Sequence, residues 1–133
     1  MRDRLDREGG QPLTSGRAER VRALYQAFND RDLDVVISAM APDVDWPNGW
    51  EGGRLLGSDD VRQYWERQWA QVRPTTTVRR IVERPDGTVE AQVRMVVRDP
   101  DGTVLTRSDV VHVYEFAEPL VQRMSVEEGR ARR

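Results

Sequence analysis

The chain has 133 residues and a formal net charge of -2 at pH 7, with 38% apolar and 33% charged residues. This length is sufficient for one core and leaves no room for a second domain. Because the sequence holds no cysteine, disulfide bonds, thiol catalysis and thiolate metal sites are excluded, and we expect a cytoplasmic location.

The distribution of charge and hydropathy argues against nucleic-acid and membrane partners. Every basic side chain is an arginine, and the arginines alternate with aspartate and glutamate without forming a basic patch. No segment approaches the apolar length that a membrane span needs, and the first twenty residues lack the apolar run of a signal peptide. We therefore expect no nucleic acid and no membrane among the partners.

One domain is predicted over residues 15–128. Residues 1–14 are polar, charged and contain Gly and Pro, so they bury too little surface to offset their ordering entropy. They are predicted to be a disordered leader, and residues 129–133 are predicted to be a polar tail.

Two helices are predicted to form a hairpin at the start of this domain. The first runs from Ser15 or Gly16 to about Asn29. Its apolar residues recur at i, i+3, i+4 and i+7 and are Val21, Leu24, Tyr25 and Phe28. Asp32 is a suitable N-cap for a shorter second helix, which Pro42 ends. The same spacing recurs there in Leu33, Val36, Ile37 and Met40.

Residues 43–53, D-V-D-W-P-N-G-W-E-G-G, have the composition of a loop but contain two of the four tryptophans. Water disfavours the apolar surface of an indole ring, so we expect Trp46 and Trp50 to cover an opening in the fold. A third helix is predicted to begin with Ser58 as its cap and to end before Pro74. Its buried side is predicted to consist of Val61, Trp65, Trp69 and Val72.

The second half of the chain alternates with a period of two, which is typical of strands. The predicted strands cover about 76–83, 88–98, 103–116 and 120–126. Two P-D-G-T-V turns join the first three strands, with Asp-Gly where a tight hairpin needs it. Helices followed by an antiparallel meander predict an α+β fold, in which three N-terminal helices pack on a curved, mainly antiparallel sheet and leave a hollow.

Four strings, in this order, resemble a known family. They are L-Y-Q-A-F-N-D-R-D-L-D-V-V at 24–36, A-P-D-V-D-W at 41–46, G-S-D-D-V-R-Q-Y-W-E at 57–66 and V-V-H-V-Y-E-F at 110–116. Together they are similar to the SnoaL-like branch of the nuclear transport factor 2-like superfamily, which includes the ketosteroid isomerases. The resemblance implies a cone-shaped α+β fold with a deep pocket, often dimeric through the outer face of the sheet.

His112 is the only histidine and is predicted to share one strand face with Val110, Tyr114 and Phe116. The resemblance places it near the position where steroid isomerases hold a neutral aspartic acid as an oxyanion donor. A histidine there could donate a hydrogen bond or transfer a proton near neutral pH. The alternative is a core histidine whose hydrogen bond goes to a carbonyl or to a tyrosine hydroxyl.

Two further residues are candidates for catalysis together with His112. Tyr25 lies one position away from the tyrosine that steroid isomerases use on their first helix, and the alternative is a core tyrosine. Where those enzymes place their proton-abstracting carboxylate, before a proline, this sequence has Trp46. The adjacent Asp45 is the remaining acid, although strand alternation turns it toward solvent unless the chain bulges there.

The predicted ligand pocket is aromatic and mostly apolar. Its lining is predicted to include Trp46, Trp50, Trp65, Trp69, Met95, Tyr114 and Met124. Epoxide hydrolases of the superfamily use an Asp-Arg-Asp constellation, but Met124 stands near the place of the final aspartate, and Arg94 is expected to face solvent or an interface. One histidine with scattered carboxylates gives no metal-ligand spacing, and we expect no metal and no cofactor.

Three functions are compatible with these residues. The first is a SnoaL-like pocket protein for an apolar or aromatic small molecule, with or without acid/base turnover. The second is an isomerase, cyclase or dehydratase centred on His112. The third is a non-catalytic dimerisation or assembly module with a vestigial pocket. The resemblance also implies a homodimer.

Overall fold

The computed structural model describes residues 13–128, so most of the predicted leader and the whole predicted tail lie outside the described residues. Helix α1 spans Leu13–Asn29 and α2 spans Leu33–Ser38, followed by β1 (Met40–Pro47) and β2 (Arg54–Leu56). Helix α3 spans Ser58–Trp69. The remaining strands are β3 (Arg73–Glu83), β4 (Val89–Arg98), β5 (Val104–Ala117) and β6 (Leu120–Glu128).

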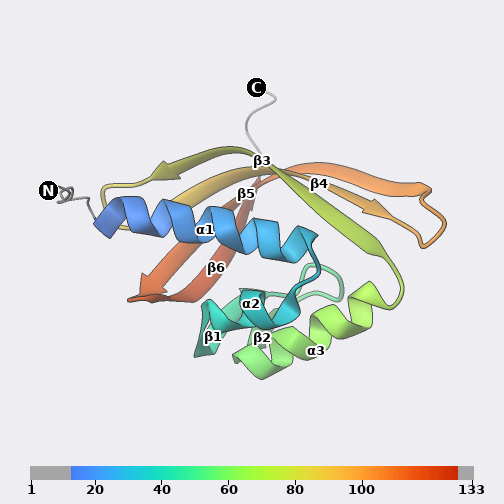
Figure 1. Cartoon of the computed structure of the whole chain (residues 1–133), viewed down its shortest axis with the longest axis horizontal. Coiled ribbons are helices and arrows are strands. Elements are labelled where there is room, and N and C mark those ends of the chain that lie inside the picture. The colour runs from blue at the N-terminus through green and yellow to red at the C-terminus, as the bar shows by residue number, and fades with distance from the viewer. Residues whose placement is uncertain (1–12, 129–133) are drawn as a thin grey trace, which may run out of the picture.

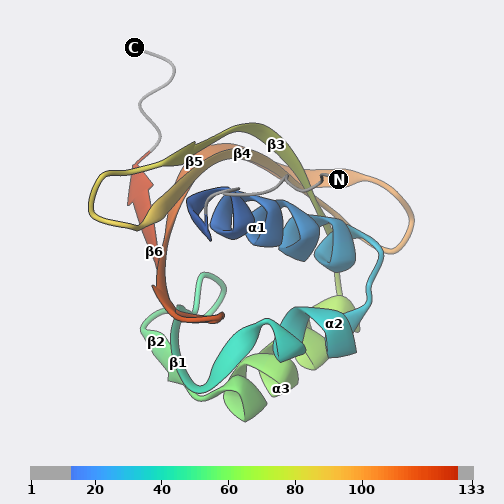
Figure 2. The same ribbon diagram turned by 60° about the vertical axis from the view of Figure 1, so that its left-hand side comes forward.

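The strands form one six-stranded sheet in the order β2-β1-β6-β5-β4-β3. Every neighbouring pair is antiparallel except β1 with β6. The sheet curves around α1, and α2 and α3 close the side that the sheet leaves open (Figures 1 and 2). This arrangement confirms the predicted α+β class and the mainly antiparallel, curved sheet.

Helix α1 packs against the concave side of the sheet through its apolar face. Val21, Leu24, Tyr25 and Phe28 are all buried, with 0 to 6% of their surface exposed. The predicted spacing of this helix is therefore correct, although α1 begins at Leu13 instead of Ser15 or Gly16.

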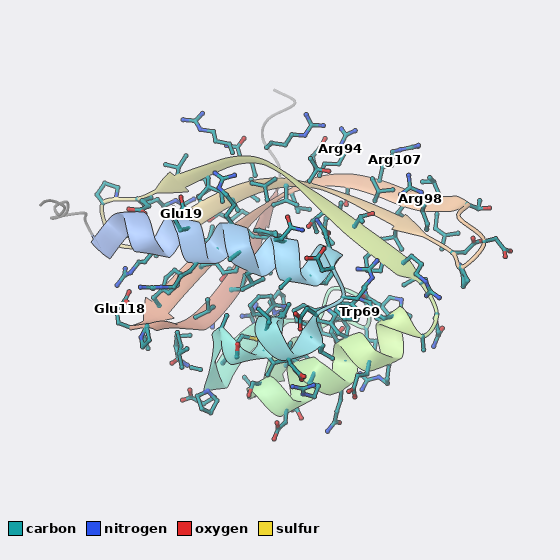
Figure 3. The ribbon with its side chains drawn as sticks, viewed as in Figure 1. Glu19, Trp69, Arg94, Arg98, Arg107 and Glu118 are labelled. Carbon is teal, nitrogen blue, oxygen red and sulfur yellow. The ribbon has the colours of Figure 1, made fainter. Side chains whose placement is uncertain are left out.

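The long hairpins form where the sequence predicts them. Gly87 and Gly102, each within a P-D-G-T-V turn, have φ values of 90° and 95°, a left-handed conformation that glycine adopts at no steric cost. The outer face of β5 differs from an ordinary exposed sheet face, because Val111 and Val113 are buried within the single chain. Arg94 lies on this outer side, as do Arg98 and Arg107 (Figure 3), and it pairs with Asp109 at 2.9 Å.

Several predicted element boundaries around residues 38–74 are wrong. The second helix ends at Ser38, most of β1 lies in the residues predicted as a loop, and β2 follows directly after them. The N-cap of α3 is Gly57, whose amide donates to the Val44 carbonyl at 2.8 Å, and Ser58 is the first helical residue. Pro74 lies within β3 and does not end the helix. Edge and parallel pairing with distant strands, which local composition does not reveal, accounts for these differences.

Candidate functional site

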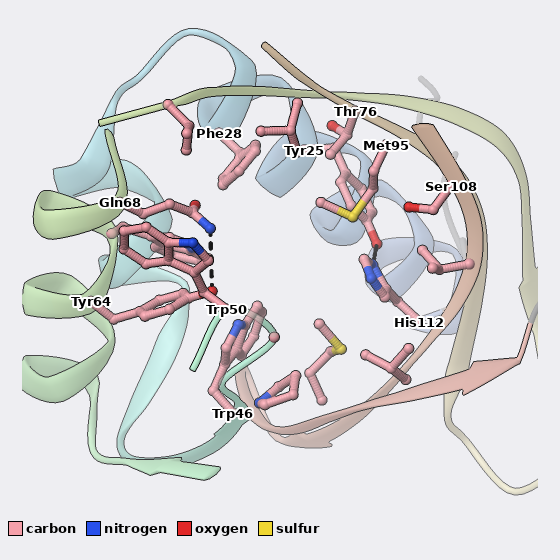
Figure 4. A pocket seen from close by; sticks show the side chains of 18 of the residues that line it. Tyr25, Phe28, Trp46, Trp50, Tyr64, Gln68, Thr76, Met95, Ser108 and His112 are labelled. Carbon is pink, nitrogen blue, oxygen red and sulfur yellow. Dashed lines mark hydrogen bonds between the residues drawn. The ribbon is translucent and has the colours of Figure 1, made fainter. Parts of the chain in front are cut away.

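A cavity of about 540 Å³ lies between α1, α3 and the concave face of the sheet (Figure 4). Its wall contains no Asp, Glu or Arg side chain among the described residues. Apolar and aromatic groups dominate the wall, and a few hydroxyl, amide and imidazole groups interrupt it. Cavities of this size and character are typical of small-molecule sites.

The alternation of β5 carries side chains into this cavity. Val110, His112 and Tyr114 line it, whereas the intervening Val111 and Val113 lie on the outer face. Strand pairing sets Ala91 of β4 beside His112 and Met124 of β6 beside Tyr114. The imidazole is thus held in the middle of a continuous sheet.

The structure places six of the seven predicted pocket residues in the cavity wall. These six are Trp46, Trp50, Trp65, Met95, Tyr114 and Met124. The two loop-region tryptophans differ strongly in exposure: Trp46 is 4% exposed and contacts Trp65 and Tyr114, whereas Trp50 is 39% exposed and lies over Tyr64. Trp46 is therefore part of the core, and Trp50 is a rim residue.

Trp69, predicted in the pocket, does not line the cavity. Its ring stacks behind Trp65 with centroids 6.0 Å apart, and it packs edge-on against Phe28 at 5.3 Å. The guanidinium of Arg31 lies 5.2 Å from the Trp69 ring, a favourable cation–π contact. The error arose because the predicted apolar stripe covers a wide arc of the helix, and Trp69 stands about 100° around the helix from Gln68, which does reach the cavity.

Tyr25, His112 and Tyr114 form a buried chain of hydrogen bonds. The Tyr114 hydroxyl donates to the Tyr25 hydroxyl at 2.7 Å, and the Tyr25 hydroxyl lies 2.6 Å from Nδ1 of His112. Because Tyr25 accepts from Tyr114, its own hydrogen is free to go to Nδ1. Nδ1 then accepts, which assigns the hydrogen of the neutral ring to Nε2.

The Nε2–H of His112 is directed to the cavity by elimination. Within residues 16–128, the only buried side-chain polar atom without a partner is Nε1 of Trp69. Nε2 of His112 has no protein acceptor in that range, so it retains access to the cavity, whose wall His112 forms. A ligand oxygen there would find a hydrogen-bond donor in a fixed orientation.

Burial controls the protonation of this chain. It lowers the pKa of His112 to about 4, so the ring is neutral at pH 7. Burial also raises the pKa values of Tyr25 and Tyr114 well above their ordinary value, so both phenols keep their protons. The physical cause is the same throughout, since the charged form of each group loses its hydration inside the protein.

Asp45 does not lie in the cavity. It is on the face of β1 opposite Trp46, and its carboxylate pairs with Arg54 at 2.7 Å and with Arg123. The pairing of β1 with β6 shifts register between Met40 and Asp45, but alternation is regular from Val44 to Pro47 and turns Asp45 outward. The structure thus brings Tyr25 to His112 but leaves Asp45 outside.

Sequence reasoning missed a polar pair on α3. Tyr64 and Gln68 both line the cavity, and Nε2 of Gln68 lies 3.3 Å from the Tyr64 hydroxyl. Their spacing of i, i+4 was the available signal, because it places both on one side of the helix beside Trp65. Ser108 was also missed, although it shares the inward parity of His112 on β5.

No group of three or more potential metal ligands occurs among the described residues. None of the described helices has both the length and the apolar character needed to cross a membrane.

The family of the chain follows from its sequence match. A model of the SnoaL-like domain matches residues 21–124, and the chain therefore belongs to this family, within the nuclear transport factor 2-like superfamily. No curated protein matched the sequence.

Several solved structures share the fold over most of their length. TerC, co-crystallised with polyporic acid, is 26% identical, with a TM-score of 0.70 over 86% of this chain and 92% of that chain. Rv0760c from Mycobacterium tuberculosis, in complex with estradiol-17β-hemisuccinate, is 14% identical, with a TM-score of 0.74 over 86% and 95%. SalBIII, an epoxide hydrolase/cyclase-like enzyme with a role in pyran ring formation in the polyether salinomycin, is 18% identical, with a TM-score of 0.73 over 88% and 93%.

Proposed function

We propose that this SnoaL-like protein binds a neutral apolar or aromatic small molecule in its cavity, anchored by one hydrogen bond from His112. The observation that carries the proposal is the uncharged, aromatic-walled cavity of about 540 Å³ with a single imidazole in its wall. Burial of apolar ligand surface supplies the affinity, at roughly 25 cal/mol per Å² before the costs of association.

The charge of the wall restricts the ligand. An ionised group held among these residues would lose its hydration without gaining an opposite charge, because the wall described contains none. The buried part of the ligand is therefore uncharged, and any ionised group stays at the mouth. The ligands of TerC and Rv0760c, both of this fold, support a small organic molecule as the class.

Acid/base turnover is a second candidate, favoured by the Tyr114–Tyr25–His112 chain. With a pKa of about 4, the imidazolium fraction at pH 7 is about one in a thousand, so His112 is a poor proton donor. It is better suited to stabilise a developing oxyanion through Nε2–H, in the manner of a preorganised donor. An isomerase would also need a base, and Asp45 is held outside the cavity by two arginines.

The assembly-module alternative is less well supported. A vestigial pocket would be filled by its large side chains, whereas Trp46, Trp65 and Met124 surround open volume. The homodimer remains a prediction, as does the cytoplasmic location. The burial of Val111 and Val113 within one chain means that a partner is not needed to cover them, and light scattering would determine the oligomeric state.

Ligand binding can be tested directly through the tryptophans of the cavity. Testosterone and 9-fluorenone, both uncharged and added separately, are expected to change the intrinsic fluorescence in a saturable way, and calorimetry would give the affinity. The His112→Phe variant keeps a ring but loses the donor, and we expect affinity to fall about 2- to 12-fold, the worth of one hydrogen bond. Arg94→Gln, on the outer face, is the matched control. Absence of binding by both compounds would contradict the proposed function.

A further inference from the structure

A second polar site lies on the cavity wall that faces His112. Tyr64 and Gln68 project from α3 on one side of the cavity, while Tyr25 and His112 lie on the other (Figure 4). Phe28 and Met95 contribute apolar surface between these two poles, and Thr76 and Ser108 lie toward the His112 side. A ligand that fills the cavity therefore meets polar groups at two separate ends.

The two poles differ in their hydrogen-bonding capacity. At the His112 pole, Nδ1 is used by Tyr25, and only the Nε2–H donor is left. At the α3 pole, Gln68 donates to the Tyr64 hydroxyl at 3.3 Å, which leaves the Tyr64 O–H as a donor and the Gln68 carbonyl as an acceptor. If the amide is turned over, the pair still keeps a donor on Gln68 and an acceptor on Tyr64.

This pair opens on the cavity, because among the described residues neither Tyr64 nor Gln68 has a side-chain polar atom that is both fully buried and without a partner. Tyr64 is 4% exposed, its ring packs against Trp50 and Trp65, and burial raises the pKa of its phenol. Gln68 is half-buried beside it. The Tyr64 hydroxyl has hydrogen bonds with Gln68 and with the Trp50 backbone, so within the described residues its hydrogen and the Gln68 carbonyl are what the pair can offer to a ligand.

We propose that the ligand has a carbonyl oxygen that accepts from His112 and, at its other end, a hydroxyl group that both donates to and accepts from the Tyr64–Gln68 pair. The buried part of the ligand thus carries a carbonyl oxygen at one end and a hydroxyl group at the other, with apolar surface between them. This inference rests on the proposed function, since it assigns the polar groups of a ligand for the same cavity. Tyr64 and Gln68 determine which ligand is selected.

The test compares three steroids that share a four-ring skeleton. Testosterone carries both the ketone and the hydroxyl, androst-4-en-3-one lacks the hydroxyl, and 5α-androstan-17β-ol lacks the ketone. Their dissociation constants would be measured by calorimetry with the wild-type chain, Gln68→Leu, Tyr64→Phe and His112→Phe. Gln63→Leu, an exposed glutamine on the same helix, is the matched control, and thermal melting verifies that each variant folds.

The wild-type chain and Gln63→Leu are expected to bind testosterone about 2- to 12-fold more tightly than androst-4-en-3-one, the worth of one added hydrogen bond. The hydroxyl ratio is the affinity for testosterone divided by that for androst-4-en-3-one, and the ketone ratio is the affinity for testosterone divided by that for 5α-androstan-17β-ol. In Gln68→Leu and Tyr64→Phe the hydroxyl ratio should fall toward one, while the ketone ratio is unchanged. In His112→Phe the ketone ratio should fall toward one, while the hydroxyl ratio is unchanged.

Two failures can be told apart. If the steroids bind and the hydroxyl ratio is the same in wild type, Gln68→Leu and Tyr64→Phe, the second pole is refuted and the proposed function stands. If none of the three steroids binds the wild-type chain, the proposed function fails for ligands of this size, and the second pole fails with it.

Discussion

Acidification is expected to destabilise the protein through His112, its only histidine. In the unfolded chain this imidazole has a pKa of about 6.5, whereas burial lowers the pKa to about 4 in the folded chain. Between these two values the unfolded state binds more protons than the folded state. The free energy of unfolding therefore falls as the pH decreases from about 6.5 to 4, and this contribution levels off below that range.

The size of this effect follows from the pKa difference. A shift from 6.5 to about 4 corresponds to at most about 3.5 kcal/mol over the whole titration, at about 1.4 kcal/mol for each pH unit. Glu51, Asp86, Glu90 and Glu118 also have lowered pKa values, chiefly through hydrogen bonds from Asn48, Thr88, Arg84 and Arg17. Their contributions are lost at lower pH, as each carboxylate is protonated, and they do not involve the imidazole.

The assay is urea denaturation at half-unit steps from pH 7.5 to 4, with wild type and His112→Asn compared. The carboxylates are common to both proteins, so the difference between the two free energies of unfolding isolates the imidazole. We expect that difference to decline by about 2 to 3 kcal/mol as the pH falls from 6.5 to 4. A flat difference, or an imidazole resonance that titrates near pH 6.5 by NMR, would refute the buried neutral histidine.

Three further predictions concern single side chains. Tyr25→Phe leaves two buried polar groups without partners and should destabilise by about 2 to 4 kcal/mol in urea denaturation, clearly more than Tyr114→Phe, which removes only the end of the chain; equal costs would contradict the hydrogen-bond order. Trp46→Ala should lower the free energy of unfolding by about 3 to 5 kcal/mol, whereas Trp50→Ala should mainly weaken ligand binding, as measured by calorimetry. The reverse pattern would mean that Trp50 is the core residue and Trp46 the rim residue. Asp45→Asn should lower the free energy of unfolding by about 1 kcal/mol or less and leave ligand affinity unchanged. A loss of binding would show that Asp45 takes part in the ligand site.

The sequence predicts those parts of the fold whose signal is local. Helix α1 is identified by a four-residue apolar stripe, and the β3–β4 and β4–β5 hairpins by Asp-Gly turns in which Gly87 and Gly102 have positive φ. Strand β1 is missed because its pairing is distant: Met40 aligns with Val121 in β6. Prolines and aspartates make up half of its residues, and only the alternation of its inward side chains indicated a strand.

The same distinction between local signals and long-range contacts applies to the candidate site. The strand parity of His112 and the apolar face of Tyr25 place both near the hollow, but their contact joins residues 87 positions apart, so it emerges only from the packing of α1 on β5. Gln68 was overlooked because a glutamine on a helix is usually a surface residue. Trp69 was assigned to the pocket because an i, i+4 aromatic pair gives no indication of which ring faces a cavity and which lies behind it.

The burial that fixes His112 also decides between the proposed functions. The hydrogen bond from Tyr25 orients the ring and directs Nε2–H toward the cavity, while the burial of the ring lowers its pKa to about 4. A histidine that is buried from solvent to this extent is not protonated at pH 7 and is therefore a poor proton carrier there. Recognition of a ligand oxygen gains from the same shielding, because a donor in a low-dielectric wall binds more strongly than one in water. The geometry therefore favours binding over proton transfer, and any chemistry at this site would proceed by stabilising charge on the ligand.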